Sequence, residues 1–225
     1  PKPAKVNTVR FVLKTAQGDL APIVEDRRQR VISRDRSRAV VEVRAVPEGM
    51  PEVLTDAERT RALASTPYEP LTDPRVVKAA KQARGNARTT REIIQNVTHF
   101  VNGHVKEKTL GRAYATATAT LDTREGDCTE HSVLASALLR ANGVPTRLAD
   151  GVIWFNKNLG YHEWLEAFVD GEGWVPVDPT FDEPSAGPNR VKFITGTSEP
   201  GDLMTMGLSA AQAFRGLTVE VEKFD

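Results

Sequence analysis

The chain of 225 residues contains a single cysteine, Cys128. One thiol excludes an internal disulfide and a zinc site built from several cysteines. No stretch approaches the roughly 20 consecutive apolar residues of a membrane-spanning helix, so we expect no membrane span. The sequence also has no cleavable signal pattern and begins with Pro1 rather than Met. We therefore expect a processed form or a piece of a longer product, which favours a periplasmic or secreted location.

The chain has no net charge as a whole, but the two halves carry opposite charges. Residues 1–112 hold 22 Lys and Arg against 13 Asp and Glu, and residues 113–225 hold 8 against 17. The basic run at 27–38 alternates with apolar and acidic residues, so it predicts a solvated strand face and no nucleic-acid partner. We expect the opposite charges to help the halves associate or to orient a polar substrate.

The distribution of strand and helix patterns predicts a mixed α+β protein. Segments 6–14, 28–33 and 38–46 alternate with period two and predict a small antiparallel β subdomain at 1–50. A proline-rich stretch at 51–73, with a short helical candidate at 55–65, is interpreted as a linker. Residues 74–225 form the predicted larger domain.

Helix signals open this larger domain. Pro74 suits a first helical position, and Thr89 with Glu92 forms a possible capping box. A further helix is predicted from Cys128 to Ala141. Strands are then predicted at 146–155, 161–169 and 174–177, and the segments 191–195 and 217–222 could add edge strands.

The order of Cys128, His162 and Asp178 suggests a nucleophilic thiol, its base and the group that orients the base. A helix N-terminus favours an anion, so we expect Cys128 to form its thiolate more easily than a free cysteine does. An inert buried cysteine and a turn-forming aspartate are the alternatives. His131, one helical turn after Cys128, could compete as the base or bind a metal with it.

The pairing of the last two predicted strands decides whether His162 reaches Asp178. A simple four-residue turn would place Leu165 opposite Asp178, with His162 on the other face. If residues 169–173 form the connection, Trp164 opposes Asp178 and His162 becomes its diagonal neighbour. We predict this longer, irregular connection.

Three motifs, GDCTEHSVLASALLRANGVPTR, YHEW and GWVPVDPTF, resemble those of the transglutaminase-like superfamily of papain-related cysteine enzymes, in a bacterial type of member. The resemblance covers about residues 90–182 and implies a papain-like core with the cysteine at a helix N-terminus packed on an antiparallel sheet. It implies Cys128 as nucleophile, His162 as general base and acid, and Asp178 as orienter. The backbone N–H of Cys128 would be one oxyanion donor, and Tyr114 is a candidate for the second.

The resemblance implies acyl transfer on peptide or side-chain amides through a thioester. Hydrolysis by a thiol protease or amidase is favoured, transglutaminase activity is the alternative, and a non-catalytic peptide-binding or scaffold protein is a third possibility. We expect a protein or peptide substrate, no cofactor and no metal, and the oligomeric state stays open. Trp164, Glu163 and His131 are candidates for the substrate groove. The stretch after Phe181 lacks the further histidine that many bacterial relatives carry there.

Overall fold

The computed structural model describes residues 6–107, 114–156 and 158–224. Its first sheet contains the three N-terminal strands that the sequence predicts, joined by a strand from the end of the chain. The order is β2-β3-β1-β8, and all pairs are antiparallel. The strands are β1 (Thr8–Thr15), β2 (Gln29–Arg34), β3 (Arg38–Arg44) and β8 (Leu217–Phe224). The predicted edge strand at 217–222 is therefore confirmed.

The second sheet is also antiparallel, with the order β6-β5-β4-β7. Its strands are β4 (Thr146–Phe155), β5 (Asn158–Val169), β6 (Gly173–Val177) and β7 (Arg190–Gly196). All three strands predicted after residue 145 are present, and the segment at 191–195 forms the edge strand β7. Because β4 and β5 are long and central, they form the platform on which the helices pack.

Six helices are present in the described residues: α1 (Asp56–Ala62), α2 (Pro74–Arg84), α3 (Thr90–His104), α4 (Ala117–Thr123), α5 (Cys128–Ala141) and α6 (Pro200–Phe214). Pro74 opens α2, the capping box of Thr89 and Glu92 opens α3, and α5 has the predicted bounds. The sequence reasoning missed α6. Its Pro200-Gly201 start and its interior Gly207 suggest a loop, whereas the burial of Leu203 and Met206 holds it as a helix.

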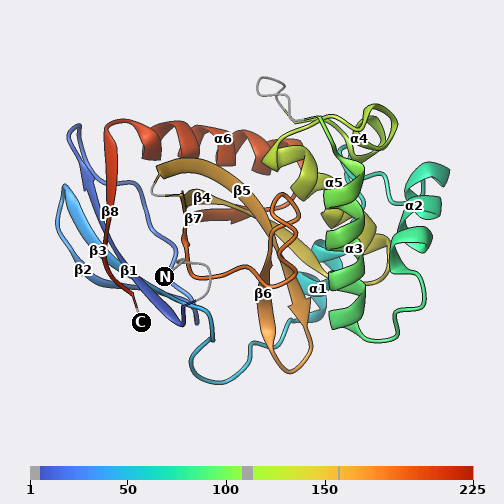
Figure 1. Cartoon of the computed structure of the whole chain (residues 1–225), viewed down its shortest axis with the longest axis horizontal. Coiled ribbons are helices and arrows are strands. Elements are labelled where there is room, and N and C mark those ends of the chain that lie inside the picture. Colours follow the sequence, from blue (N-terminus) through green and yellow to red (C-terminus); the bar gives the residue numbers. More distant parts are fainter. Residues whose placement is uncertain (1–5, 108–113, 157, 225) are drawn as a thin grey trace.

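Two hydrophobic cores lie on either side of the second sheet (Figure 1). One packs α2, α3 and α5 against strands β4, β5 and β6, with Leu134, Leu138 and Leu165 fully buried. The other lies between the two sheets and includes Phe11 of β1 and Val191 of β7. In Figure 1, α6 runs along the top of both layers, and its residues contribute to both cores.

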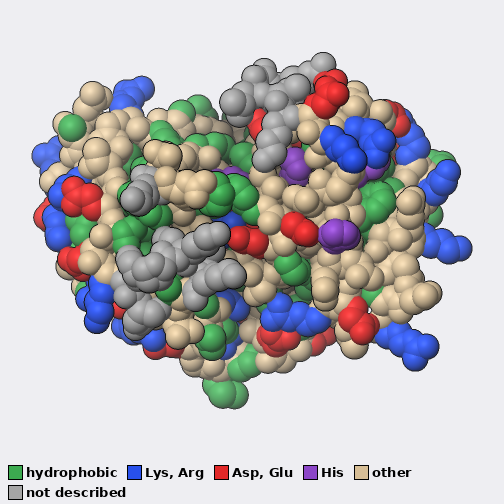
Figure 2. All heavy atoms as spheres, in the orientation of Figure 1, with side chains coloured by type: hydrophobic (Ala, Val, Ile, Leu, Met, Phe, Trp, Pro, Cys, Tyr) green, Lys and Arg blue, Asp and Glu red, His purple; other side chains and the backbone are tan. Residues whose placement is uncertain are grey.

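Ion pairs connect the basic first half of the chain to the acidic second half. They join Lys14 to Glu220, Arg59 to Asp170, Arg61 to Asp202 and Arg91 to Glu172. These contacts support the expectation that the opposite charges help the halves associate. Exposed pairs of this kind each contribute about 1 kcal/mol or less to the stability of the fold. They therefore orient the two halves of the chain more than they stabilise their association. Figure 2 shows acidic and histidine side chains near the middle of one face, with many Lys and Arg side chains at its outline.

The chain is thus a mixed α+β protein with two antiparallel sheets, as the sequence predicts. The division at residues 51 and 74 stays a prediction. The pairing of β8 with β1 makes the C-terminal strand part of the same sheet as the predicted N-terminal subdomain. Among the described residues, no helix combines the length and the apolar character that a membrane crossing requires.

Candidate active site

Cys128 is the first residue of α5, and the local sequence explains why the helix begins there. Asp127 is the N-cap, and its side chain accepts a hydrogen bond from the backbone N–H of Thr129 (3.0 Å). The carboxylate of Glu130 accepts from the backbone N–H of Asp127 (3.0 Å), which completes a capping box. These bonds satisfy N–H groups that a helix start leaves without partners, so they fix the backbone that carries the thiol.

Glycine is required two residues before the thiol. A Cβ atom at Gly126 would lie 2.3 Å from the Cβ of Glu130, well inside van der Waals contact. Glu130 is 2% exposed and also accepts from the backbone N–H of Ala115 (2.9 Å). The Gly126-Asp127-Cys128 sequence thus lets Glu130 hold the start of α5 and the segment next to Tyr114 together.

The environment of the thiol differs from the expectation. Burial raises the pKa of the Cys128 thiol above its usual value, the charges of Asp127 and Asp178 raise it further, and a charge on Glu163 acts in the same direction. The backbone N–H of Glu163 acts in the opposite direction. Burial therefore opposes the thiolate that the helix N-terminus favours, since it removes the anion from water. A positive charge on the neighbouring imidazole is the remaining way to stabilise it.

His162 and Asp178 are in direct contact. Nε2 of His162 lies 2.6 Å from Oδ2 of Asp178, and the two residues are 4% and 0% exposed. This bond leaves Nδ1 as the ring nitrogen that can face a substrate or a thiol. The ring stacks on Trp164, with centroids 6.2 Å apart, and also contacts Phe181 at 5.4 Å. The imidazole is therefore held in one orientation by a carboxylate and two aromatic rings.

The strand register that permits this contact is the predicted one. Val169 pairs with Gly173 and Leu165 with Val177, so the next pair along the ladder would be Trp164 and Asp178. His162 is then diagonal to Asp178. The connection at 170–172 includes Gly171 at a φ of 81°, and Gly173 follows at 87°, values that favour glycine. The predicted register is confirmed, but the connection is the three residues 170–172 and not the longer stretch 169–173, because Val169 and Gly173 also pair.

The structure does not join all three residues by hydrogen bonds. Within the described residues, no hydrogen bond connects Cys128 Sγ to the His162 ring. The sulfur lies instead beside the backbone of Glu163, the residue after His162, and it is close enough to Asp178 for that charge to affect the thiol pKa. The three predicted residues therefore gather in one region, and only His162 and Asp178 are directly bonded.

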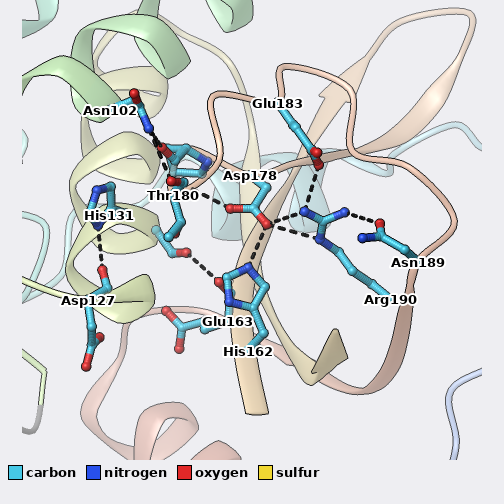
Figure 3. A network of polar contacts seen from close by, with 12 residues as sticks. Asn102, Asp127, His131, His162, Glu163, Asp178, Thr180, Glu183, Asn189 and Arg190 are labelled. Carbon is cyan, nitrogen blue, oxygen red and sulfur yellow. Dashed lines mark hydrogen bonds and ion pairs between the residues drawn. The ribbon is translucent and has the colours of Figure 1, made fainter. Parts of the chain in front are cut away.

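Arg190, which the sequence reasoning missed, is the main partner of Asp178 besides His162 (Figure 3). Its Nε donates to Oδ2 of Asp178 at 3.0 Å, and its Nη2 donates to the same oxygen and to Glu183. Burial acts to raise the pKa of Asp178. The positive charges of Arg190 and His162 outweigh burial, so the pKa lies well below its usual range. Asp178 is thus ionised and shared between an arginine and a histidine.

A side chain of α3 fixes the turn after Asp178 by hydrogen bonds. Asn102 donates from its side-chain amide to the carbonyl oxygens of Pro179 (3.0 Å) and Thr180 (3.2 Å). The backbone N–H of Thr180 donates to Oδ1 of Asp178 (3.1 Å). These contacts, drawn in Figure 3, fix the Asp-Pro-Thr turn and leave Oδ2 for the histidine and the arginine.

Tyr114 lies beside this region, and its hydroxyl donates to Oε2 of Glu163 at 2.9 Å. Its φ of 27° is unusual for a residue other than glycine. Together with Tyr161 and Phe214 it lines a groove of about 400 Å³, which borders both chain neighbours of Cys128. The full lining is Tyr114, Asp127, Thr129, Tyr161, Gly207, Ala210, Ala211 and Phe214. The groove is therefore walled mainly by small and aromatic residues, with α6 along one side.

The three residues expected to line a groove lie beneath the surface instead. Trp164, Glu163 and His131 are 3%, 0% and 1% exposed. Trp164 borders a small cavity of about 30 Å³ that residues of both sheets line, and Nδ1 of His131 is bonded to the carbonyl oxygen of Asp127 at 2.6 Å. Direct contact with a substrate is not supported for any of them. In the described residues, no group of three or more potential ligands could hold a metal ion.

Asp150 and Tyr161 are further residues of the site that sequence reasoning did not single out. Asp150 lies on β4 directly opposite Glu163, and Tyr161 lies on β5 one residue before His162. The sequence carries one signal for them. Asp150 interrupts a strand that is otherwise buried, and a buried charge is rare without a local reason.

Part of the chain is similar to known proteins. Residues 77–179 match the family model described as the transglutaminase-like superfamily. An 81-residue segment is 30% identical to a protein-glutamine gamma-glutamyltransferase of Pseudomonas aeruginosa, and it covers 32% of this chain and 12% of that protein. The chain thus spans a small part of this curated relative.

Two solved structures share the fold. A candidate cysteine protease from Cytophaga hutchinsonii superimposes with a TM-score of 0.63 at 15% identity, over 99% of this chain and 90% of the other. The periplasmic domain of TgpA from Pseudomonas aeruginosa gives 0.58 at 20% identity, over 80% and 72%. At these identities the similarity shows a common fold.

Proposed function

We propose that this chain, which carries a transglutaminase-like superfamily domain at residues 77–179, is a cysteine-dependent acyl-transfer enzyme that hydrolyses peptide or side-chain amides. The observation that carries the proposal is the 2.6 Å contact between His162 and Asp178 beside the helix that begins with Cys128. A buried imidazole oriented by an ionised carboxylate is the arrangement that a thiol nucleophile needs as its base.

In the proposed mechanism, His162 takes the proton of the Cys128 thiol as the sulfur attacks the amide carbonyl carbon. The tetrahedral intermediate then collapses, the C–N bond breaks, and His162 returns the proton to the leaving amine. A thioester on Cys128 remains. Water attacks it with His162 again accepting a proton, which releases the acid and restores the thiol.

The raised pKa of the thiol fits this order of events. Since burial and the carboxylates of Asp127 and Asp178 oppose a free thiolate, the proton leaves the sulfur together with the attack or with charging of His162. Asp178 stabilises the resulting imidazolium, because it stays ionised between Arg190 and His162.

Two groups are available for the developing oxyanion. The backbone N–H of Cys128 lies at the start of α5, where helix N–H groups lack internal partners. Tyr114 is the second candidate donor. Its hydroxyl borders the groove but is bonded to Glu163 in the resting structure, so it would have to turn toward the substrate.

Transglutaminase activity is the second candidate. It is favoured by the 30% identity of one segment to a protein-glutamine gamma-glutamyltransferase. In that case an amine instead of water attacks the thioester. A non-catalytic peptide-binding role is the third candidate, and it predicts that Cys128 can be replaced without loss of function.

The test is incubation of the protein with casein, with and without a primary amine, followed by mass spectrometry. Hydrolysis predicts cleaved peptides or deamidated glutamine, and transamidation predicts incorporation of the amine. The Cys128→Ala variant should lose both activities. Activity that survives this substitution would refute a cysteine mechanism.

A further inference from the structure

Asp150 and Glu163 form a carboxyl pair at the edge of the proposed active site. They are directly opposite each other on the antiparallel strands β4 and β5, so their side chains share one face of the sheet. They are 1% and 0% exposed. Neither is paired with a Lys or Arg in the ion pairs of the described residues. Two carboxylates buried side by side without a cation would repel each other strongly.

Three oxygens of the pair lack a donor. Both Oδ atoms of Asp150 and Oε1 of Glu163 are buried without a hydrogen bond of normal geometry from the described residues, and only Oε2 of Glu163 receives one, from Tyr114. A buried acceptor without a donor destabilises the fold, because it has lost its hydrogen bonds to water. A proton shared between the two carboxyl groups supplies one donor between them and removes one of the two charges.

The surroundings decide where that proton lies. Facing Glu163 are Asp150 from β4, Tyr114 and, from α5, Glu130. Burial and the charge of Asp150 raise the pKa of Glu163 well above its usual value. Burial also raises the pKa of Asp150, to about 6, but the nearby Tyr161 hydroxyl, the Glu163 carboxyl and the charge of His162 act to lower it. These directions favour a proton on Glu163 and the negative charge on Asp150.

The position of Glu163 makes this arrangement relevant to the thiol. Its backbone N–H lowers the pKa of Cys128, its carboxylate charge would raise it, and its carbonyl oxygen accepts from Ser132 of the same helix at 3.3 Å. An ionised Glu163 would thus oppose formation of the thiolate. The other charged groups that affect the sulfur are Asp127 of α5 and Asp178.

We propose that Asp150 and Glu163 share one proton, and that Asp150 acts as a positioning residue by holding the negative charge on itself and keeping the Glu163 carboxyl beside Cys128 neutral. The role in catalysis rests on the proposed function, whereas the shared proton and its effect on the thiol do not. The function of the pair is to limit negative charge at the position where a sulfur anion must form.

The proposal is tested by the rate of Cys128 alkylation with iodoacetamide as a function of pH. In Asp150→Asn, the repelling charge is lost and the new amide can donate to Glu163, so Glu163 ionises beside the sulfur. The apparent pKa of alkylation should rise by about one unit. Glu163→Gln mimics the protonated acid and should leave the profile close to that of the unchanged protein.

The double variant Asp150→Asn, Glu163→Gln provides the decisive comparison. Since it carries no ionisable group at either position, it should reverse the shift caused by Asp150→Asn alone. A purely structural role predicts that the second substitution adds to the damage, and this result would overturn the proposal. Asp122→Asn, an exposed carboxylate on α4, is the matched control and should change nothing.

Infrared spectroscopy gives a second readout that does not depend on how Asp150→Asn folds. At neutral pH the unchanged protein should show the carbonyl stretch of a protonated carboxylic acid, and the difference spectrum against Glu163→Gln should contain that band. Absence of the band from the difference spectrum would also overturn the proposal. Neither measurement requires enzymatic activity, so failure of the proposed function would be seen separately in the casein assay.

Discussion

Arg190 donates two hydrogen bonds to the oxygen of Asp178 that also faces the His162 ring. The carboxylate charge is therefore divided between a permanent cation and an imidazole. Arg190 keeps Asp178 ionised, but it also weakens the stabilisation that Asp178 can give to a protonated His162. The first two predictions follow from this arrangement.

Replacing Asp178 with Asn should reduce kcat/KM by a factor on the order of 10³ to 10⁴, because the amide can present the wrong group to Nε2 of His162. It should also destabilise the fold by about 3 kcal/mol, since the buried Arg190 loses its main anionic partner. Steady-state kinetics and urea unfolding measure the two effects. Asp170→Asn, at the exposed end of the β5–β6 hairpin, is the control and should alter neither quantity appreciably.

Replacing Arg190 with Gln should change the pH dependence of kcat/KM, because a nearby positive charge is removed and Asp178 then interacts with the imidazole alone. We expect a limb of the pH profile of kcat/KM to move up by about one unit. Arg190→Lys keeps the positive charge and should move this limb of the pH profile less, although the pair of hydrogen bonds to Asp178 is lost. A limb that does not move in Arg190→Gln would show that Arg190 has only a structural role.

Replacing Gly126 with Ala should disturb the start of α5. The new Cβ would lie 2.3 Å from the Cβ of Glu130, so the capping box and the bond to Ala115 must shift. We expect a loss of about 1–3 kcal/mol in the free energy of unfolding, together with a changed alkylation rate of Cys128. Gly103→Ala, in α3, has open space around its Cβ and should be neutral or stabilising. Equal stability of the two variants would contradict this account.

Acid should destabilise the protein partly through Glu166. Burial acts to raise its pKa, but Lys192 and Arg147 lower it to about 2 from the usual 4.5. Because the pKa is lower in the folded state, the stabilisation is fully present above about pH 4.5 and is lost as the pH falls toward 2. The shift corresponds to about 3 kcal/mol. In Glu166→Gln, the free energy of unfolding should therefore fall less steeply over this range, as measured by urea unfolding at a series of pH values.

The parts of the fold that local chemistry determines could be predicted from the sequence. Pro74, the capping box of Thr89 and Glu92, and the start of the apolar run at Cys128 mark true helix starts. The register between β5 and β6 followed from asking which connection brings His162 to Asp178. The helix starts depend on residues close together in the chain. The strand register depends on the alternation of side chains between the two faces of a strand, which allows few pairings.

The features that were missed depend on packing between distant segments. Arg190 reaches Asp178 only because the chain returns from β6 to β7 beside it, and nothing in the stretch GPNRVKF signals this. The sequence predicts that Glu163 lines the substrate groove, whereas it is fully buried. Its burial follows from the contact of β5 with α5, which alternation along one strand cannot reveal. The raised pKa of the Cys128 thiol likewise follows from burial between segments that are distant in the chain.

The helix α6 connects the two sheets directly, since β7 precedes it in one sheet and β8 follows it in the other. The same helix supplies Gly207, Ala210, Ala211 and Phe214 to the groove beside Cys128. A shift of one sheet relative to the other must therefore move this wall. The N-terminal strands, although far from the thiol in sequence, help to set the width of the opening that a substrate would enter.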